Sequence, residues 1–235
     1  MAAKKRFYKS VALASDEFGF SVQLDGKDVR SPAGKMLHLP NVALAEEIAK
    51  EWQAQKDEID PSSMPLFSLA VTVVDRVTPQ RDIMIAELTS YGGNDLLCYR
   101  GDQDDLAIRQ RELWQPWLDH LAKNSDIHLK IGTGIMPIFQ PDAGKFIPLI
   151  AAYDNWRLGM LHRATSLSGS LVLGLVFVDA TIDIDQMFEL SFLEELWQNE
   201  KWGKDFEALD RHEFLRVELQ NVLCFLLLLT YKTAV

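Results

Sequence analysis

The segment TSLSGSLVLGLVFV, residues 165–178, is the feature that most restricts how this chain can fold. On a helix with 3.6 residues per turn its residues are apolar or small on every side, so no polar face is left for solvent. A helix of this kind belongs at the centre of a bundle, where its small residues let neighbours approach closely. We therefore expect one helix over residues 156–178, enclosed by other helices.

The same helical period continues through most of the chain. We expect further helices at about residues 66–76, 79–91, 104–114, 116–124, 145–153, 185–202 and 205–231. Pro116 is expected to break or kink its helix, because proline lacks an N–H and clashes with the preceding turn. Short strands are expected between helices at residues 95–100 and 127–131.

The first sixty residues follow a different pattern. FSVQLDGKDVR, residues 20–30, contains Asp25-Gly26 between two short runs, which is the signal of a β-hairpin. A helical stripe of Leu44, Ile48 and Trp52 follows, and Asp60-Pro61 ends this part. The sequence predicts an α+β protein. A small β-rich N-terminal unit with one helix, residues 1–60, precedes a larger, mostly α-helical domain like an orthogonal bundle, residues 61–235.

The charge of the chain limits its partners. Its formal net charge is −10, and both nucleic acids and anionic lipid surfaces need basic surface. We therefore expect neither nucleic-acid binding nor docking on a membrane, whereas a basic protein surface remains a suitable partner.

Cysteine content and hydropathy favour a soluble intracellular protein. The two cysteines, Cys98 and Cys224, form no disulfide framework. The first ten residues are basic but are not followed by an apolar stretch, as a secretory signal would require. The longest apolar run, residues 222–229, is far shorter than the ~20 residues that cross a bilayer, so no membrane insertion is expected.

No set of residues has a spacing that predicts catalysis, metal binding or cofactor binding. The histidines are scattered and match no zinc-ligand pattern; they are His38, His120, His128, His162 and His212. The sequence also lacks a phosphate-binding loop and the nucleophile motif GxSxG. We expect no metal and no cofactor.

Acidic and aromatic residues gather in LEELWQNEKWGKDFEA, residues 193–208. On a helix, Glu194 lies at the margin of an apolar stripe that contains Trp197, whereas Glu195 points about 100° away and looks solvated. Glu194 either finds a partner inside the fold or sets one acid into an exposed apolar face that binds a protein. Periodicity alone favours the internal partner.

Tryptophan and glycine add to this segment. Most of the six tryptophans are expected to be packing anchors, but tryptophan is also favoured at binding hot spots, so one or two can be exposed. Spacing does not say whether Trp197 or Trp202 is exposed. Gly203 is expected to end the helix, with Asp205 as the N-cap of the next one.

Several motifs, in this order, resemble one known family. They are RFYKSV, LDGKDVRSPAGK, EWQAQKDEIDPSSMPL, DLLCYR, RQRELWQPWLDH, SGSLVLGL and LEELWQNEKWGKDFEA. Together they resemble the assembly chaperones for the α subunit of the catalytic sector of F-type ATP synthase. The resemblance extends from about Arg6 to Leu229, nearly the whole chain.

The resemblance implies a chaperone, not an enzyme. Such a protein binds the unassembled α subunit and prevents its aggregation until the β subunit displaces it. The family's important glutamate falls at Glu194 or Glu195, and the helical wheel favours Glu194. Trp52 matches a family tryptophan and is expected to hold the first helix onto the helical domain. A monomer is expected, in the bacterial cytoplasm or, for a eukaryotic member, in the mitochondrial matrix.

Two other hypotheses stay open at this point. A small hydrolase would need a carboxylate within hydrogen-bond reach of His162 or His212 in a deep pocket. A scaffold protein without a particular client would have no contiguous apolar surface patch.

Overall fold

The computed structural model describes residues 4–134, 136–203 and 206–230. The chain divides into two compact units, one made of residues 1–80 with 221–235 and the other of residues 81–220. The first unit contains a small antiparallel sheet and the second is mostly helical, so the predicted α+β class is confirmed. The sequence placed a boundary at residue 60, whereas the first compact unit also includes residues 61–80 and the end of the last helix.

Three antiparallel strands form the sheet of the first unit. They are β2 (Val11–Asp16), β3 (Gly19–Leu24) and β4 (Lys27–Asp28), in the order β2-β3-β4. Asp25 and Gly26 connect β3 to β4 with φ angles of 49° and 78°. A tight two-residue turn that matches the strand twist needs positive φ at both positions. The hairpin predicted at Asp25-Gly26 is therefore confirmed.

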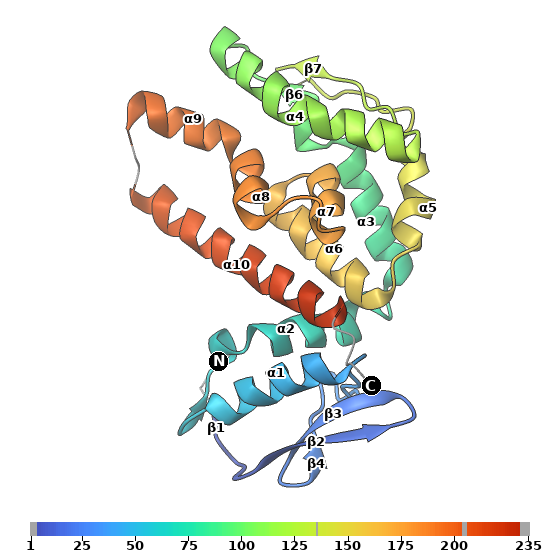
Figure 1. Ribbon diagram of the computed structural model, residues 1–235, viewed down its shortest axis with the longest axis vertical. Helices are drawn as coiled ribbons and strands as arrows, with labels where there is room; N and C mark the ends of the chain where they lie inside the picture. Colours follow the sequence, from blue (N-terminus) through green and yellow to red (C-terminus); the bar gives the residue numbers. More distant parts are fainter. Residues whose placement is uncertain (1–3, 135, 204–205, 231–235) are drawn as a thin grey trace. The chain divides into compact units, whose positions relative to one another are not determined.

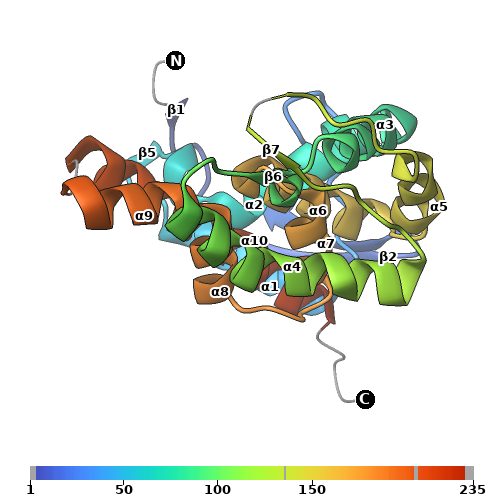
Figure 2. The ribbon, with the colours of Figure 1, turned by 90° about the horizontal axis from the view of Figure 1, so that it is seen from above.

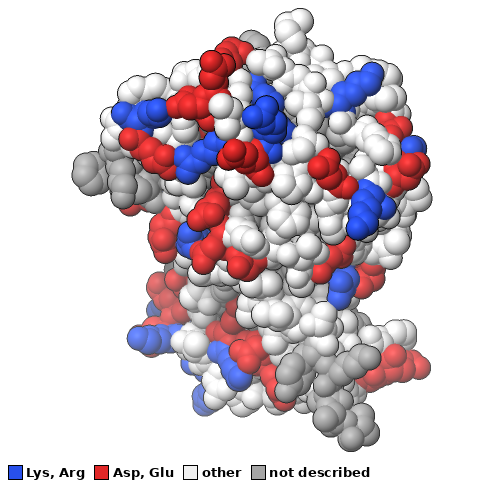
Figure 3. Space-filling model, turned by 45° about the horizontal axis from the view of Figure 1, so that its top comes forward, with Lys and Arg blue, Asp and Glu red and all other residues white. Residues whose placement is uncertain are grey.

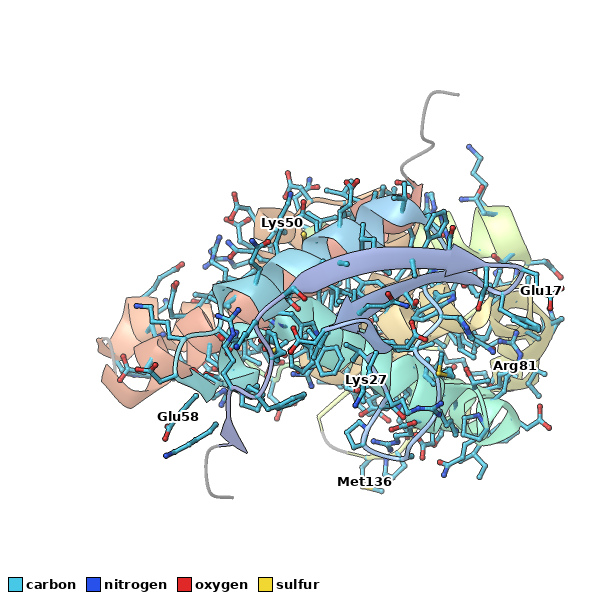
Figure 4. All side chains as sticks on the ribbon, turned by 90° about the horizontal axis from the view of Figure 1, so that it is seen from below. Glu17, Lys27, Lys50, Glu58, Arg81 and Met136 are labelled. Carbon is cyan, nitrogen blue, oxygen red and sulfur yellow. The ribbon has the colours of Figure 1, made fainter. Side chains whose placement is uncertain are left out.

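Helix α1 (Val42–Ala54) packs on β2 and β3 of this sheet (Figures 1 and 4). Asn41 caps its N-terminus by accepting a hydrogen bond from the N–H of Leu44. Leu44, Ile48 and Trp52 are buried, as the predicted stripe requires. Residues four apart lie on one side of a helix, so a single face of α1 contributes to the core of this unit.

A carboxylate joins α1 to the next helix, α2 (Pro65–Thr72). Glu51 accepts hydrogen bonds from the backbone N–H groups of Leu66 and Phe67, each at 2.8 Å. Backbone N–H groups at a helix start have no partner within the helix, and a carboxylate there also matches the helix dipole. The short elements of this unit are β1 (Lys4–Lys5), paired with β5 (Glu58–Ile59), the 3-10 turn η1 (Pro61–Ser63) and the π turn η2 (Val73–Val77).

The second unit is built around α7 (Leu171–Val178), whose eight residues are all buried. Helices α4 and α6 both pack on α7, and Figure 2 shows α4 lying across it. The helices that surround α7 or follow it are α3 (Arg81–Gly93), α4 (Asp104–Ser125), α5 (Phe146–Ala151), α6 (Asn155–Ser168), α8 (Ile184–Ser191), α9 (Leu193–Trp202) and α10 (Phe206–Thr230). The predicted central position of the apolar segment is thus found.

Residues 156–178 do not form the single helix that was expected. Gly169 ends α6 with a φ of 74°, a left-handed conformation that favours glycine. Ser170 then caps α7 by accepting a hydrogen bond from the N–H of Leu173 at 3.0 Å. Fully buried Asp95 accepts from the Ser170 hydroxyl at 2.7 Å and from the Val172 N–H at 3.0 Å. These polar partners hold the break inside the core.

The helix boundaries at Pro116 and Phe192 also differ from the prediction. Helix α4 continues through Pro116, because buried packing on both sides holds it; the indole of Trp114 donates to the carbonyl of Leu190 at 2.9 Å. Tertiary contacts of this kind override local preference. In contrast, the helix expected over residues 185–202 is broken at Phe192, whose backbone has φ −111° and ψ 21°.

Only part of the two expected short strands is found. Residues 95–100 form the turn η3 (Leu96–Cys98) and the strand β6 (Tyr99–Arg100). Its parallel partner is β7 (Gly132–Thr133), so the strand predicted at residues 127–131 starts later than expected. The turn η4 (Ala143–Lys145) leads into α5.

None of the helices, within the described residues, combines the length and the apolar character needed to span a bilayer.

Candidate partner-binding site

Glu194 lies in the first turn of α9 and is half-buried. Its Oε1 accepts a hydrogen bond from Nε2 of Gln110 at 2.5 Å. Gln110 is fully buried on α4, and its own Oε1 accepts from the backbone N–H of Gly101 at 2.7 Å. This relay from Gly101 through Gln110 fixes the position of the Glu194 carboxylate, so the internal partner that periodicity favoured is present.

The same carboxylate also borders a groove of about 660 Å³, which we call the Glu194 groove. Arg100 and Asp102 line it from the end of β6, and Gly134 and Pro137 line it from the loop after β7. Glu194 is therefore anchored inside the fold and also lines a concave surface, while its role in binding a partner stays a prediction.

Arg100 is an unusual member of this groove because it is only 8% exposed. Its Nη1 donates to the carbonyl of Leu97, and its guanidinium carbon lies 5.2 Å from the centre of the Trp114 ring. Its Nη2 has no hydrogen-bond partner among the described residues. Burial lowers the pKa of Arg100 from its ordinary value, because it disfavours the charged form.

The helical wheel suggested that Glu195 is solvated, and its side chain is 37% exposed, but it also has partners within the fold. Its Oε1 accepts from Arg211 at 2.6 Å, and its Oε2 lies 2.8 Å from Nε2 of His212. Both partners are on α10. The wheel treated residues 185–202 as one helix, whereas the structure breaks this segment at Phe192 and places Glu195 beside α10.

The two histidines considered for a hydrolase each face a carboxylate. His212 is buried between Phe188 and Phe192, with ring centres 5.3 Å away in each case. His162 lies 3.1 Å from Glu87, between α6 and α3. Packing and ion pairing account for both histidines.

The two tryptophans of α9 have opposite environments. Trp197 is buried, whereas Trp202 is 69% exposed, and their ring centres are 5.4 Å apart at nearly right angles. Lys201 lies 5.5 Å from the Trp197 ring and forms an ion pair with Asp105 at 2.7 Å. The hydrogen bond from Lys201 lowers the pKa of Asp105 below its ordinary value.

A second ion pair joins α9 to α4. Arg109 binds both carboxylate oxygens of Glu200, at 2.7 and 3.0 Å. Figure 3 shows acidic and basic side chains interspersed, with uncharged surface between them. Together with the Lys201–Asp105 pair, this contact holds α9 along α4 and leaves Trp202 at the end of the helix.

Trp52 and Gly203 were expected to have structural roles. The Trp52 ring packs against Tyr8 and Phe67, with ring centres 5.7 and 5.0 Å away, and its carbonyl accepts from the Tyr8 hydroxyl at 2.6 Å. Phe67 belongs to α2, so Trp52 contributes to the contact between α1 and α2. Gly203 follows α9 with a φ of 94°. Asp205, the expected N-cap, lies outside the described residues.

Across the described residues, the side chains form no group of three or more His, Cys, Asp or Glu that could hold a metal ion. Cys98 is a buried free thiol and Cys224 an exposed one. Burial raises the pKa of Cys98 to about 12, so this thiol stays protonated at neutral pH.

Sequence reasoning missed Gln110, Arg100 and Asp102. Only Gln110 has a signal in its pattern: it is a polar residue four positions from both Leu106 and Trp114, which are buried on the same side of α4. A polar side chain within an apolar stripe needs a buried partner. Arg100 ends the short strand β6 and Asp102 follows it in a loop, and their place beside Glu194 depends on the tertiary fold.

Comparisons with known proteins connect this fold to one family. The sequence matches the family described as ATP12 chaperone protein over residues 5–122. The crystal structure of Atp12 from Paracoccus denitrificans is 37% identical, with 96% of this chain and 98% of that chain covered and a TM-score of 0.90. Mitochondrial protein atp12 of Schizosaccharomyces pombe is 23% identical, covering 93% of this chain and 79% of that protein. Mitochondrial protein ATP12 of Saccharomyces cerevisiae is also 23% identical, covering 90% of this chain and 81% of that protein.

Proposed function

We propose that this chain, which belongs to the ATP12 chaperone family, binds the unassembled α subunit of F-type ATP synthase and prevents its aggregation until the β subunit displaces it. The observation that carries the proposal is the 37% identity to Atp12 over 96% of the chain. The family consists of chaperones and not of enzymes, so the pairs formed by His162 and His212 need no catalytic explanation.

The client-binding surface in this proposal is built on α9 and the Glu194 groove. Glu194 offers a carboxylate whose position is fixed by Gln110, and Trp202 offers an exposed aromatic ring. Trp197 supports Trp202 from within the unit, and Glu195 ties α9 to Arg211 and His212. Buried aromatic anchors and fixed charges are the groups that commonly dominate the energy of protein interfaces.

Masking is the proposed mechanism. An acid-edged surface covers apolar α-subunit surface that would otherwise aggregate, and the β subunit later takes its place. No nucleotide is required, since the sequence has no phosphate-binding loop. The protein acts as a monomer, in the cytoplasm of a bacterium or in the mitochondrial matrix of a eukaryote. This location is supported by its relatives, which include a Paracoccus protein and mitochondrial yeast proteins.

The test is a light-scattering assay of isolated α subunit with wild type, Glu194→Ala or Glu195→Ala. We expect wild type to keep α soluble and Glu194→Ala to lose most of this effect while its circular dichroism is unchanged. Glu195→Ala removes the contacts to Arg211 and His212, so its main effect should be a lower unfolding temperature. If wild type fails to keep α soluble, the proposed function is wrong.

A further inference from the structure

We propose that the Glu194 groove binds an extended segment of the client that carries a lysine or arginine side chain, with Asp102 and Glu194 as the two anionic groups that recognise it. This inference rests on the proposed function and names the chemistry by which the client is held. Three observations support it. Two carboxylates line the groove, one nitrogen of Arg100 has no hydrogen-bond partner among the described residues, and exposed apolar residues lie in the loop beside the groove.

Both carboxylates are available to a basic ligand. Asp102 is exposed, and no hydrogen bond or ion pair to it is found in the described part of the chain. A methyl group added at Gly134 would lie 3.7 Å from Oδ1 of Asp102, so the Asp102 carboxylate faces the loop on the other wall. Glu194 uses Oε1 to accept from Gln110. A cation entering between these walls meets two carboxylates that form no ion pair with a lysine or arginine in the described part of the chain.

Arg100 adds a requirement that a simple cation does not meet. Its Nη2 lacks an acceptor among the described residues although the side chain is more than nine-tenths buried. A buried donor without a partner is costly, and an oxygen from a bound molecule would satisfy it. Nη2 is buried, so a bound oxygen reaches it only after a side-chain movement, which is common at interfaces.

These two requirements together select a peptide. A free anion is repelled by Asp102 and Glu194, and a free cation leaves Nη2 of Arg100 without an acceptor. An extended peptide with a basic residue supplies both a neutral carbonyl oxygen and a positive side chain. The groove therefore matches main-chain recognition combined with one basic side chain.

The loop that forms one wall of the groove is suited to the residues that flank the basic one. Met136 and Phe139 are 75% and 81% exposed, and they lie in the same loop as the lining residues Gly134 and Pro137. Met136 is labelled in Figure 4. Large apolar side chains that are exposed beside a polar groove are typical of protein interaction sites. A client surface that aggregates by itself is apolar, so the exposed side chains of Met136 and Phe139 are suitable contacts for it.

The experiment measures the binding of isolated α subunit to the full chain by titration. The test variant is Asp102→Asn/Glu194→Gln. Both changes keep the shape, and glutamine can still accept from Gln110. The control, Glu112→Gln/Glu189→Gln, removes the same charge from exposed positions outside the groove. We expect the dissociation constant of the test variant to rise about tenfold or more and that of the control to stay within about twofold.

Salt dependence provides the second readout. Raising salt from about 0.1 M to about 1 M shortens the screening length from about 10 Å to about 3 Å. Wild-type affinity should fall over this range, and the affinity of the test variant should fall much less. Met136→Ser/Phe139→Ser should weaken binding without changing the salt dependence. Unchanged circular dichroism establishes that each variant is folded. If the double variant is not folded, Asp102→Asn alone is used as the test variant.

The possible results separate this inference from the proposed function. If wild type binds α and the test variant binds equally well, with the same salt dependence, the inference is wrong and the proposed function stands. The inference is equally overturned if a second copy of this chain occupies the groove, seen as a wild-type dimer that the test variant lacks. If wild type does not bind α, both proposals fail.

Discussion

Asp95 shows how one buried residue can make stability depend on pH. Its carboxylate accepts hydrogen bonds from the hydroxyl of Ser170 and from the N–H groups of Leu97 and Val172. Burial nevertheless raises its pKa from 3.8 to about 6, because desolvation outweighs these bonds. Asp95 therefore binds its proton more tightly in the folded state than in the unfolded state.

The sign of the effect follows from this difference. Between pH 3.8 and about 6 the folded state holds more protons at Asp95, so the contribution of this group to stability increases as the pH falls. From pH 7 to pH 4.5, the unfolding free energy of wild type should rise by about 2 kcal/mol relative to Asp95→Asn, which does not titrate. Urea unfolding of wild type and Asp95→Asn at both pH values measures this difference in unfolding free energy. A difference that is the same at both values would show that Asp95 titrates normally.

At the scale of elements, two glycines near the centre of the second unit have different functions. Gly169 adopts a φ of 74° with open space around its α-carbon, so its role is conformational. A Cβ at Gly174 would lie 2.4 Å from Oγ1 of Thr165 and 3.3 Å from Cδ1 of Leu161, so its role is to let α6 and α7 approach closely. This close approach is the purpose inferred for the small residues of the apolar segment.

Alanine substitutions should separate these roles. Gly169→Ala should lower the unfolding free energy by about 1 kcal/mol through backbone strain. Gly174→Ala should cost more, about 1–3 kcal/mol, because the core must move to fit the methyl group. The control Gly144→Ala, which has neither positive φ nor neighbours within 4 Å, should change it by less than about 0.5 kcal/mol. Urea unfolding checks this order, and equal effects at all three positions would contradict it.

Local chemistry explains which elements could be predicted. The turn at Asp25-Gly26 and the stripe through Leu44 and Trp52 are set by neighbouring residues, so the sequence predicts them correctly. The break at Gly169 was missed because the residues around it are all apolar or small, and because Asp95, which stabilises the break, is far away in the sequence. The helix break predicted at Pro116 was wrong because local sequence favours a break there, whereas contacts with residues far away in the sequence keep α4 continuous.

The candidate site was only half predictable for the same reason. Glu194 and Trp202 could be chosen from one segment, by helical spacing and by resemblance. The groove around Glu194 also contains Arg100, at the end of β6, and Asp102 and Gly134, from two loops that are far from α9 in the sequence. Helical periodicity carries no information on such loops. Only the tertiary fold shows that they meet.

At the scale of the whole molecule, a masking chaperone must bind strongly enough to protect its client and weakly enough to be replaced. The proposed surface is consistent with this balance: it combines a small number of charges, Asp102 and Glu194, with apolar side chains on a loop. Electrostatic complementarity speeds association and provides specificity, while affinity differences between related complexes lie mostly in the dissociation rate.

This balance leads to a prediction about exchange. When isolated β subunit is added to the preformed complex of this chain with α, the chain should be released within minutes, because the proposed mechanism has β cover the same α surface. Release can be followed by the fluorescence anisotropy of chain labelled at the exposed Cys224. Addition of bovine serum albumin at the same concentration controls for crowding and should release nothing. A sub-nanomolar complex that β cannot dissociate, or a stable ternary complex, would show that the two proteins do not compete, and the masking mechanism would have to be abandoned.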